Sequence, residues 1–150
     1  MTIFFPGSFN PFTKGHADIL MRLLKLAEKV IVGIGINPDK PSTSEQAIRN
    51  KASIEEYIEI SGVTNRVKVV VYSGLTAEEA LSQGATCMAR GVRTASDFEF
   101  ENSLACANRA AFGIETILLP ADPALSFVSS SIIRDLLYHG REDIADNFLA

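Results

Sequence analysis

The strongest constraint on the fold is the alternation of apolar extended segments with amphipathic helical segments along the whole chain. Apolar residues run almost without interruption through residues 30–36, as in a strand buried on both faces of a parallel sheet. Before that run, Ile19, Leu20 and Leu23 have helical spacing. This alternation predicts an α/β fold with one doubly wound, five-stranded parallel sheet. The expected strands are 3–5, 30–36, 67–72, 86–89 and 115–119, and the expected helices are 17–28, 43–61, 76–83, 96–112, 130–138 and 142–148.

The length of 150 residues, with no linker or repeat, predicts a single domain over residues 1–150. The net charge of −4 argues against a nucleic-acid partner. No apolar run approaches the length of a membrane span and no leader pattern opens the chain, so we expect a cytoplasmic protein without a membrane partner. Cys87 and Cys106 lack metal-ligand spacing and are expected to be reduced packing residues.

Polar or glycine-rich segments follow each expected strand. They are residues 6–16, the loop with Lys40, residues 74–76, residues 90–93 and residues 120–131. In a parallel sheet, ligands bind beyond the carboxyl ends of the strands, where the strand order reverses. We therefore expect these segments to meet at one site.

The segment after the first strand, residues 6–16, combines two glycines with hydroxyl side chains and leads into a helix. Such a loop lets backbone N–H groups approach a phosphate, and a helix N-terminus favours an anion. His16 lies in the first turn, where it could hydrogen-bond a phosphoryl oxygen. The alternative is a β–α connection that needs glycine for steric reasons and carries a surface histidine by chance. The segment is neither a Walker A loop nor a dinucleotide-binding fingerprint.

Two later segments carry groups suited to phosphate. Arg90 and Arg93 could clamp phosphates, although they could equally pair with Asp97 and Glu101, which share a helical face and complement the helix N-terminus. Serines 129–131 offer hydroxyls at another helix start, where they could cap the helix, bind phosphate or do both. A capping box between Thr43 and Gln46 is also expected.

Three of these segments resemble motifs of the bacterial phosphopantetheine adenylyltransferase family. Residues 13–16, Thr-Lys-Gly-His, resemble the T/HxGH signature of the nucleotidyltransferase superfamily. Residues 90–101 resemble R-G-x-R-x-x-x-D-F-E-[YF]-E, and residues 126–135 resemble the nucleotide-binding segment I-S-S-[ST]-x-[VI]-[RK]. The resemblance implies a Rossmann-like nucleotidyltransferase fold and transfer of the adenylyl group of ATP to 4′-phosphopantetheine, giving dephospho-coenzyme A and pyrophosphate.

The resemblance also implies roles for individual residues. His16 is the expected catalytic residue, which stabilises the transition state of a direct in-line attack. The positions implied for ATP are Ser8, Phe9, His16, Gly91, Val92, Arg93, Glu101, Leu125, Ser126, Phe127, Val128, Ser129, Ser130 and Ser131. The positions implied for 4′-phosphopantetheine are Ser8, Lys40, Thr76 and Arg90.

The family further implies Mg²⁺ held mainly by the ATP phosphates, with no protein metal ligands, a homohexamer and feedback inhibition by coenzyme A. His16, Lys40, Arg90 and Arg93, together with Mg²⁺, are expected to supply a positive field around the reacting phosphate.

Asn10 departs from the aspartate common in the family, and Gly-Ser-Phe-Asn-Pro over residues 7–11 is similar to nicotinate mononucleotide adenylyltransferases. Two alternative functions therefore stand beside the main one. The chain could adenylate nicotinate mononucleotide, or it could be a nucleotide-binding module without catalysis. Pyrophosphate release with each acceptor distinguishes the two enzymes, and calorimetric ATP binding without pyrophosphate exchange would indicate the binding module.

Overall fold

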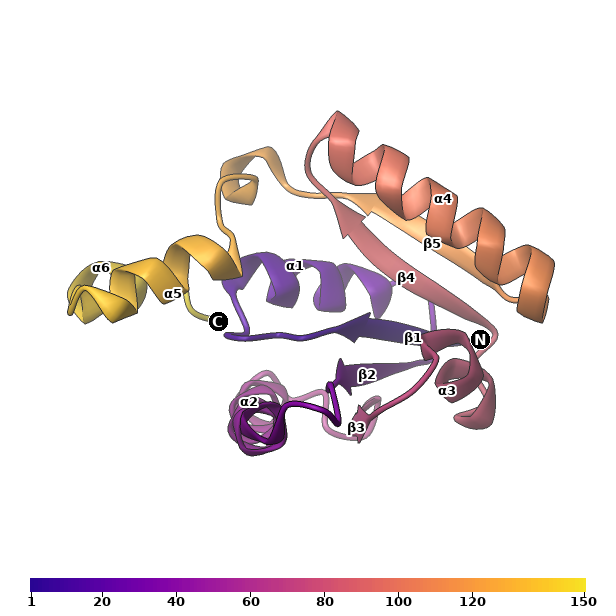
Figure 1. Cartoon of the computed structure of the whole chain (residues 1–150), viewed down its shortest axis with the longest axis horizontal. Coiled ribbons are helices and arrows are strands. Elements are labelled where there is room, and N and C mark those ends of the chain that lie inside the picture. The colour runs from indigo at the N-terminus through magenta and orange to yellow at the C-terminus, as the bar shows by residue number, and fades with distance from the viewer.

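The computed structural model describes the backbone of residues 1–150 and every side chain except that of Pro41. Its sheet has five parallel strands in the order β3-β2-β1-β4-β5. This order reverses between β1 and β4, which is the switch point of a doubly wound sheet. The predicted α/β class, strand number and strand direction are confirmed (Figure 1). The elements are β1 (Thr2–Gly7), α1 (Lys14–Leu23), β2 (Lys29–Gly35), α2 (Pro41–Ile60), β3 (Val67–Tyr72), α3 (Thr76–Ser82), β4 (Cys87–Val92), α4 (Ala95–Phe112), β5 (Glu115–Pro120), the 3₁₀ turn η1 (Pro123–Leu125), α5 (Ser130–Tyr138) and α6 (Glu142–Ala145).

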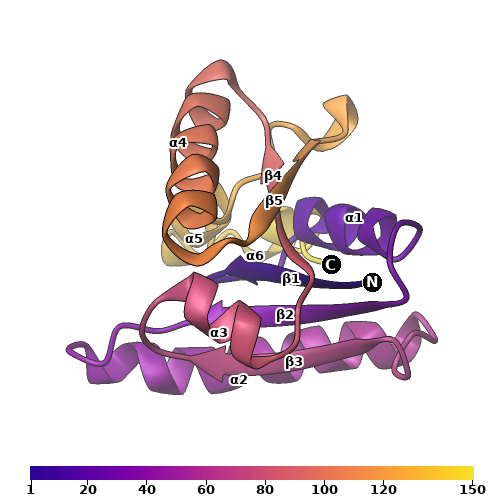
Figure 2. The same cartoon turned by 90° about the vertical axis from the view of Figure 1, so that its right-hand side faces the viewer.

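Alternate residues of the central strands supply two separate cores. Ile3 and Phe5 of β1 pack with residues of α1 and α2 on one face of the sheet. Phe4 packs on the other face with Ala77 and Ala80 of α3. This two-residue alternation explains why the central strands are apolar throughout. In Figure 2, α2 lies along β3 and α4 along β5, near the two edges of the sheet.

Several element boundaries differ from the sequence prediction. The last helix, α6, ends at Ala145, three residues before its expected end. β4 continues through Arg90–Val92, which were expected to form a loop, because these residues pair with Leu118–Pro120 of β5. α1 ends at Leu23, five residues early, where the Arg66 guanidinium binds the carbonyl oxygens of residues 24, 27 and 28. α2 begins at Pro41, and the expected capping box is wrong. Thr43 Oγ1 instead donates to the carbonyl oxygens of Asn37 and Lys40, at 2.9 and 2.7 Å.

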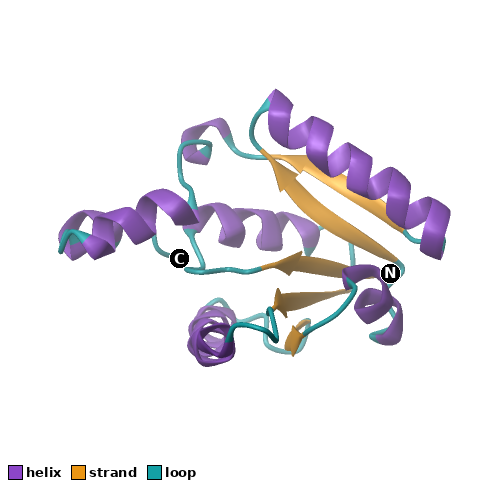
Figure 3. Cartoon of the chain, in the orientation of Figure 1, coloured by secondary structure: helices purple, strands orange, loops and turns teal.

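The C-terminal helices lie beyond the carboxyl ends of the strands (Figure 3). Val128, Ile133 and Ala145 form their small core. The Lys14 N–H donates to the Phe148 carbonyl oxygen at 2.9 Å, which ties this part of the chain to the start of α1. Within the described part of the chain, no helix is both long and apolar enough to span a membrane.

Candidate active site

The loop after β1 presents His16 at the start of α1. Thr13 is the N-cap of this helix, and its Oγ1 accepts a hydrogen bond from the His16 N–H at 3.3 Å. The His16 Nδ1 accepts from the Thr13 N–H at 3.1 Å, which completes a reciprocal capping box. Phe9, with φ of 48°, lies in the left-handed region, and its ring packs 4.9 Å from the imidazole, edge to face. The imidazole is therefore fixed from two sides.

The protonation state of His16 differs from the sequence expectation. Burial, and to a lesser extent the positive charges of Arg90 and Arg93, lower the pKa of His16 from 6.5 to about 4. The imidazole is thus neutral at pH 7 and does not contribute to the expected positive field. It can still stabilise a phosphoryl oxygen by donating a hydrogen bond.

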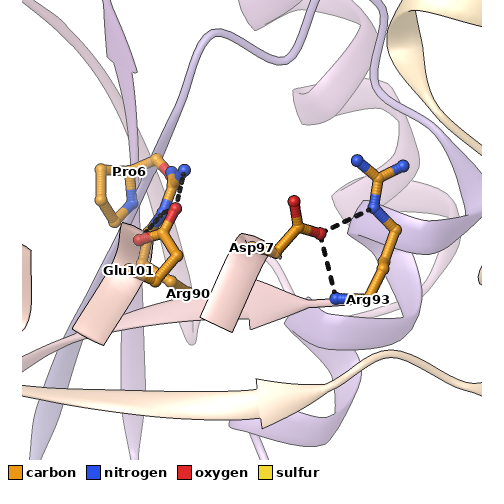
Figure 4. A network of polar contacts seen from close by, with 5 residues as sticks. All are labelled: Pro6, Arg90, Arg93, Asp97 and Glu101. Carbon is orange, nitrogen blue, oxygen red and sulfur yellow. Dashed lines mark hydrogen bonds and ion pairs between the residues drawn. The ribbon is translucent and has the colours of Figure 1, made fainter. Parts of the chain in front are cut away.

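Arg90, near the end of β4, is held by two groups, the Glu101 carboxylate on α4 and the Pro6 carbonyl on β1 (Figure 4). Its Nε lies 3.1 and 3.0 Å from the two carboxylate oxygens of Glu101, and its Nη2 lies 2.8 Å from Oε1. Its Nη1 donates to the Pro6 carbonyl oxygen at 2.7 Å. The resemblance implies ATP binding for Glu101, whereas in this structure both of its carboxylate oxygens bind Arg90. The Arg90 side chain is 36% exposed and the Glu101 side chain 8%, so the arginine keeps one open side.

Arg93 forms a second, more open pair with Asp97, as Figure 4 also shows. The Arg93 Nε lies 3.6 Å from Asp97 Oδ2, and the Arg93 N–H donates to the same oxygen at 3.2 Å. The Nη1 of Arg93 reaches the Val128 carbonyl oxygen at 3.2 Å. Arg93 therefore links α4 to the segment that precedes α5.

The serines at the start of α5 directly follow Val128, the residue that Arg93 contacts. Ser129 caps the helix by accepting from the Ile132 N–H at 3.2 Å, while the Ser130 hydroxyl donates to the Pro11 carbonyl oxygen at 3.1 Å. Arg134 donates to the Asn10 carbonyl oxygen at 2.6 Å and to the Ser131 hydroxyl at 3.2 Å. Sequence reasoning omitted Arg134 from the site, although a basic residue one turn after the serines was visible in the motif.

One cavity of about 370 Å³, here called the strand-end cavity, opens at the switch point between β1 and β4. The N-terminal ends of α1 and α5 both reach it, together with Arg90, Arg93 and Arg134. Two helix N-termini and three guanidinium groups favour a polyanion, such as a chain of phosphates. Of the residues singled out from the sequence, the cavity is lined by Ser8, Phe9, His16, Arg90, Gly91, Arg93, Glu101, Leu125, Val128, Ser129, Ser130 and Ser131.

Five expected site residues do not line the strand-end cavity. Lys40 is exposed at the N-cap of α2. Thr76 lines a second cavity of about 190 Å³, here called the side cavity, which it shares with Arg90, Glu101, Leu104 and Asn108. The other three are Val92, Ser126 and Phe127.

Known proteins identify the family. Residues 4–136 match the Cytidylyltransferase-like family model. A phosphopantetheine adenylyltransferase of Porphyromonas gingivalis is 45% identical over 142 residues, covering 95% of this chain and 90% of that protein. The chain belongs to the phosphopantetheine adenylyltransferase family. The family relationship expected from the sequence motifs is confirmed.

Solved structures share the fold of this phosphopantetheine adenylyltransferase family member at low identity. A bifunctional NMN adenylyltransferase/ADP ribose pyrophosphatase from Francisella tularensis superimposes with a TM-score of 0.65 and 19% identity, over 93% of this chain but only 42% of that larger chain. The nicotinic acid mononucleotide adenylyltransferase of Plasmodium falciparum gives a TM-score of 0.61 and 14% identity, over 99% and 89% of the two chains. Both confirm the predicted Rossmann-like nucleotidyltransferase fold.

Proposed function

We propose that the chain is a single nucleotidyltransferase domain over residues 1–150 that transfers the adenylyl group of ATP to 4′-phosphopantetheine. The observation that carries the proposal is the convergence of His16, two helix N-termini and three arginines on the strand-end cavity. The family relationship supports the choice of acceptor, because the curated relative from Porphyromonas gingivalis bears this name. The products are dephospho-coenzyme A and pyrophosphate.

The reaction is a direct displacement at the α-phosphorus of ATP. An oxygen of the acceptor's 4′-phosphate forms the new P–O bond as the bond to the bridging oxygen of the β-phosphate breaks, and pyrophosphate leaves with that electron pair. A phosphate monoester is already ionised at pH 7, so no general base is required. Catalysis therefore consists of positioning and charge stabilisation.

The residues divide between the two substrates according to the cavities they line. ATP phosphates occupy the strand-end cavity beside Arg93, Arg134 and serines 129–131, with His16 donating to the α-phosphate. The acceptor's phosphate lies against Arg90 and Ser8, because Arg90 lines both cavities. The pantetheine arm extends into the side cavity, where Thr76 and Asn108 offer polar groups and Leu104 an apolar surface. Lys40 reaches the acceptor from the more exposed side.

Mg²⁺ fits this site as a partner of the phosphates rather than of the protein. Among the residues whose side chains are described, no three His, Cys, Asp or Glu side chains form a group that could hold a metal ion. Asp97 and Glu101, the carboxylates that line the strand-end cavity, are paired with arginines. The ion would therefore bind mainly to ATP oxygens and neutralise their charge.

The family resemblance supports three further proposals. The protein acts in the cytoplasm and assembles as a homohexamer. Exposed Phe98 and Phe100 on α4 offer apolar surface for contacts between copies.

Coenzyme A inhibits by placing the pantetheine arm that it shares with the acceptor in the side cavity. Light scattering and inhibition kinetics test the assembly and the feedback directly.

A pyrophosphate-release assay tests the proposed reaction. The protein is given ATP and Mg²⁺ with either 4′-phosphopantetheine or nicotinate mononucleotide, and we expect release only with the first. Release with the second alone would assign the rival acceptor. Calorimetric ATP binding without release for either acceptor would support the non-catalytic binding module.

A further inference from the structure

Thr13 is a buried polar residue whose contacts converge on the catalytic imidazole. The residue is only 2% exposed, although it lines the strand-end cavity. Its N–H donates to His16 Nδ1 at 3.1 Å, and its Oγ1 lies 3.2 Å from the same nitrogen. Because this Oγ1 also accepts from the His16 N–H at 3.3 Å, its own proton is free to point at Nδ1.

These contacts determine which imidazole nitrogen carries the proton. A backbone N–H can only donate, so the Nδ1 that it contacts must offer a lone pair. The hydroxyl adds a second donor to that lone pair. A proton on Nδ1 would face the backbone N–H, which unlike the hydroxyl cannot turn to accept, so the neutral ring carries its proton on Nε2.

The surroundings of the ring also disfavour a positive charge. The Phe12 ring stacks on the imidazole with a centroid separation of 5.7 Å and an interplanar angle of 14°, and so helps to bury it. Burial disfavours the charged form of the ring. The charged groups that line the cavity with His16 are Arg90 and Arg93 from β4 and the residue that follows it, Asp97 and Glu101 from α4, and Arg134 from α5. Burial is the main reason that the pKa of His16 is low, at about 4, and the positive charges of Arg90 and Arg93 lower it further.

We propose that Thr13 is a positioning residue that holds His16 as a neutral imidazole with its proton on Nε2, so that His16 meets the reacting phosphate as a hydrogen-bond donor and not as a cation. The identity of that phosphate as the α-phosphate of ATP rests on the proposed function. The protonation state of His16 and its dependence on Thr13 do not rest on the proposed function.

The protonation state is measured by nitrogen NMR on protein labelled with ¹⁵N-histidine. The variant His139→Gln removes the only other histidine, so that all signals come from His16. At pH 7 we expect one protonated nitrogen, Nε2, and one unprotonated nitrogen, Nδ1. An imidazolium, or a proton on Nδ1 alone, overturns the proposal. This measurement needs neither substrate nor a change at Thr13.

The role of Thr13 is tested with a matched pair of variants. Thr13→Val removes the hydroxyl and retains the shape, and we expect the midpoint of His16 protonation to rise by about one pH unit. We expect kcat to fall about fivefold to tenfold, with the KM for ATP within twofold of wild type. Thr13→Ser keeps the hydroxyl and should restore both the midpoint and kcat.

A folded Thr13→Val protein with an unchanged midpoint and unchanged kcat overturns the role of Thr13. If Thr13→Val does not fold, the same comparison is made with Thr13→Ala against Thr13→Ser. Wild-type protein that is inactive towards 4′-phosphopantetheine but has the expected NMR spectrum refutes the proposed function and leaves this inference standing.

Discussion

The carboxyl edge of the sheet has two unlike halves. Around the ends of β1 and β4, the functional side chains are fixed by hydrogen bonds, as in the bidentate contact of Arg90 with Glu101. At the end of β2, Lys40 is exposed, and α2 begins without a side-chain cap. A group that is already positioned loses little entropy when the transition state forms. The fixed half is therefore suited to the reacting phosphate, and the open half to admitting and releasing an acceptor.

The largest expected effect is at the centre of the fixed half. His16→Ala should lower kcat by about a hundredfold or more, which is typical of losing one preorganised donor to a developing charge. The protein should still fold, because Thr13 keeps its cap bond to the backbone N–H of residue 16. Steady-state pyrophosphate release measures the loss, and exposed His139 provides the control His139→Ala. A kcat within threefold of wild type would contradict the role of His16.

The second largest expected effect is a pH dependence of stability that comes from His16 in the fixed half. The pKa of His16 is about 4 in the folded protein and about 6.5 in an unfolded chain. Between these values the unfolded chain binds a proton that the folded one does not, so the free energy of unfolding falls as pH drops from 6.5 to 4. The loss should be roughly 2–3 kcal/mol, and it should be absent above pH 7.

Urea unfolding of wild type and His16→Gln at pH 7.5, 5.5 and 4.5 measures this difference. The glutamine variant lacks the titrating group. The difference in the free energy of unfolding between the two proteins should therefore change by roughly 2–3 kcal/mol over this pH range. If this difference in the free energy of unfolding does not change with pH, His16 is not held neutral in the folded protein.

Replacing Arg90 should have a smaller effect, in two parts: weaker binding of the acceptor and lower stability. Arg90→Ala removes a contact to the acceptor's phosphate and should raise the KM for 4′-phosphopantetheine about tenfold or more, as for a lost hydrogen bond to a charged group. It also leaves the buried Glu101 carboxylate without its partner. Because the Arg90 side chain is 36% exposed, solvent screens the pair, and the cost is about 1–2 kcal/mol rather than that of a fully buried pair.

The double variant Arg90→Ala/Glu101→Gln separates the two parts. Removing the carboxylate charge should recover most of the stability without restoring the KM. Recovery of the KM in the double variant would mean that Arg90 does not bind the acceptor.

The sheet and the convergence of most of the site residues can be predicted from the sequence, because both follow from local patterns. Apolar runs predict buried strands, and parallel strands necessarily bring their carboxyl ends to one edge. The capping box at Thr13 and His16 does not follow from the usual pattern, because a histidine stands where Glu or Gln is typical. The neutral state of His16 could not be predicted, because it depends mainly on burial in the folded chain and also on Arg90 and Arg93, more than seventy residues away.

The remaining differences come from contacts between distant segments. The extension of β4 through Val92 depends on pairing with β5, and Arg90 is oriented by the carbonyl of Pro6, 84 residues earlier. Phe127 was expected at the nucleotide, yet the residue is 57% exposed and its ring packs edge to face on Phe148. A motif places a residue near the site, but the packing of the chain decides which way its side chain points.

Lys40 gives the smallest expected effect and the most direct test of the difference between the halves. The side chain is exposed and lies outside the strand-end cavity, so its contribution should be that of a solvated ion pair, up to about 1 kcal/mol. Lys40→Ala should therefore raise the KM for 4′-phosphopantetheine by about fivefold at most, leave kcat unchanged and be masked by added salt. Lys51→Ala, on the same helix and away from both cavities, is the matched control. A Lys40→Ala effect as large as that of Arg90→Ala, and insensitive to salt, would mean that the start of α2 closes over the acceptor and that both halves are fixed once substrate is bound.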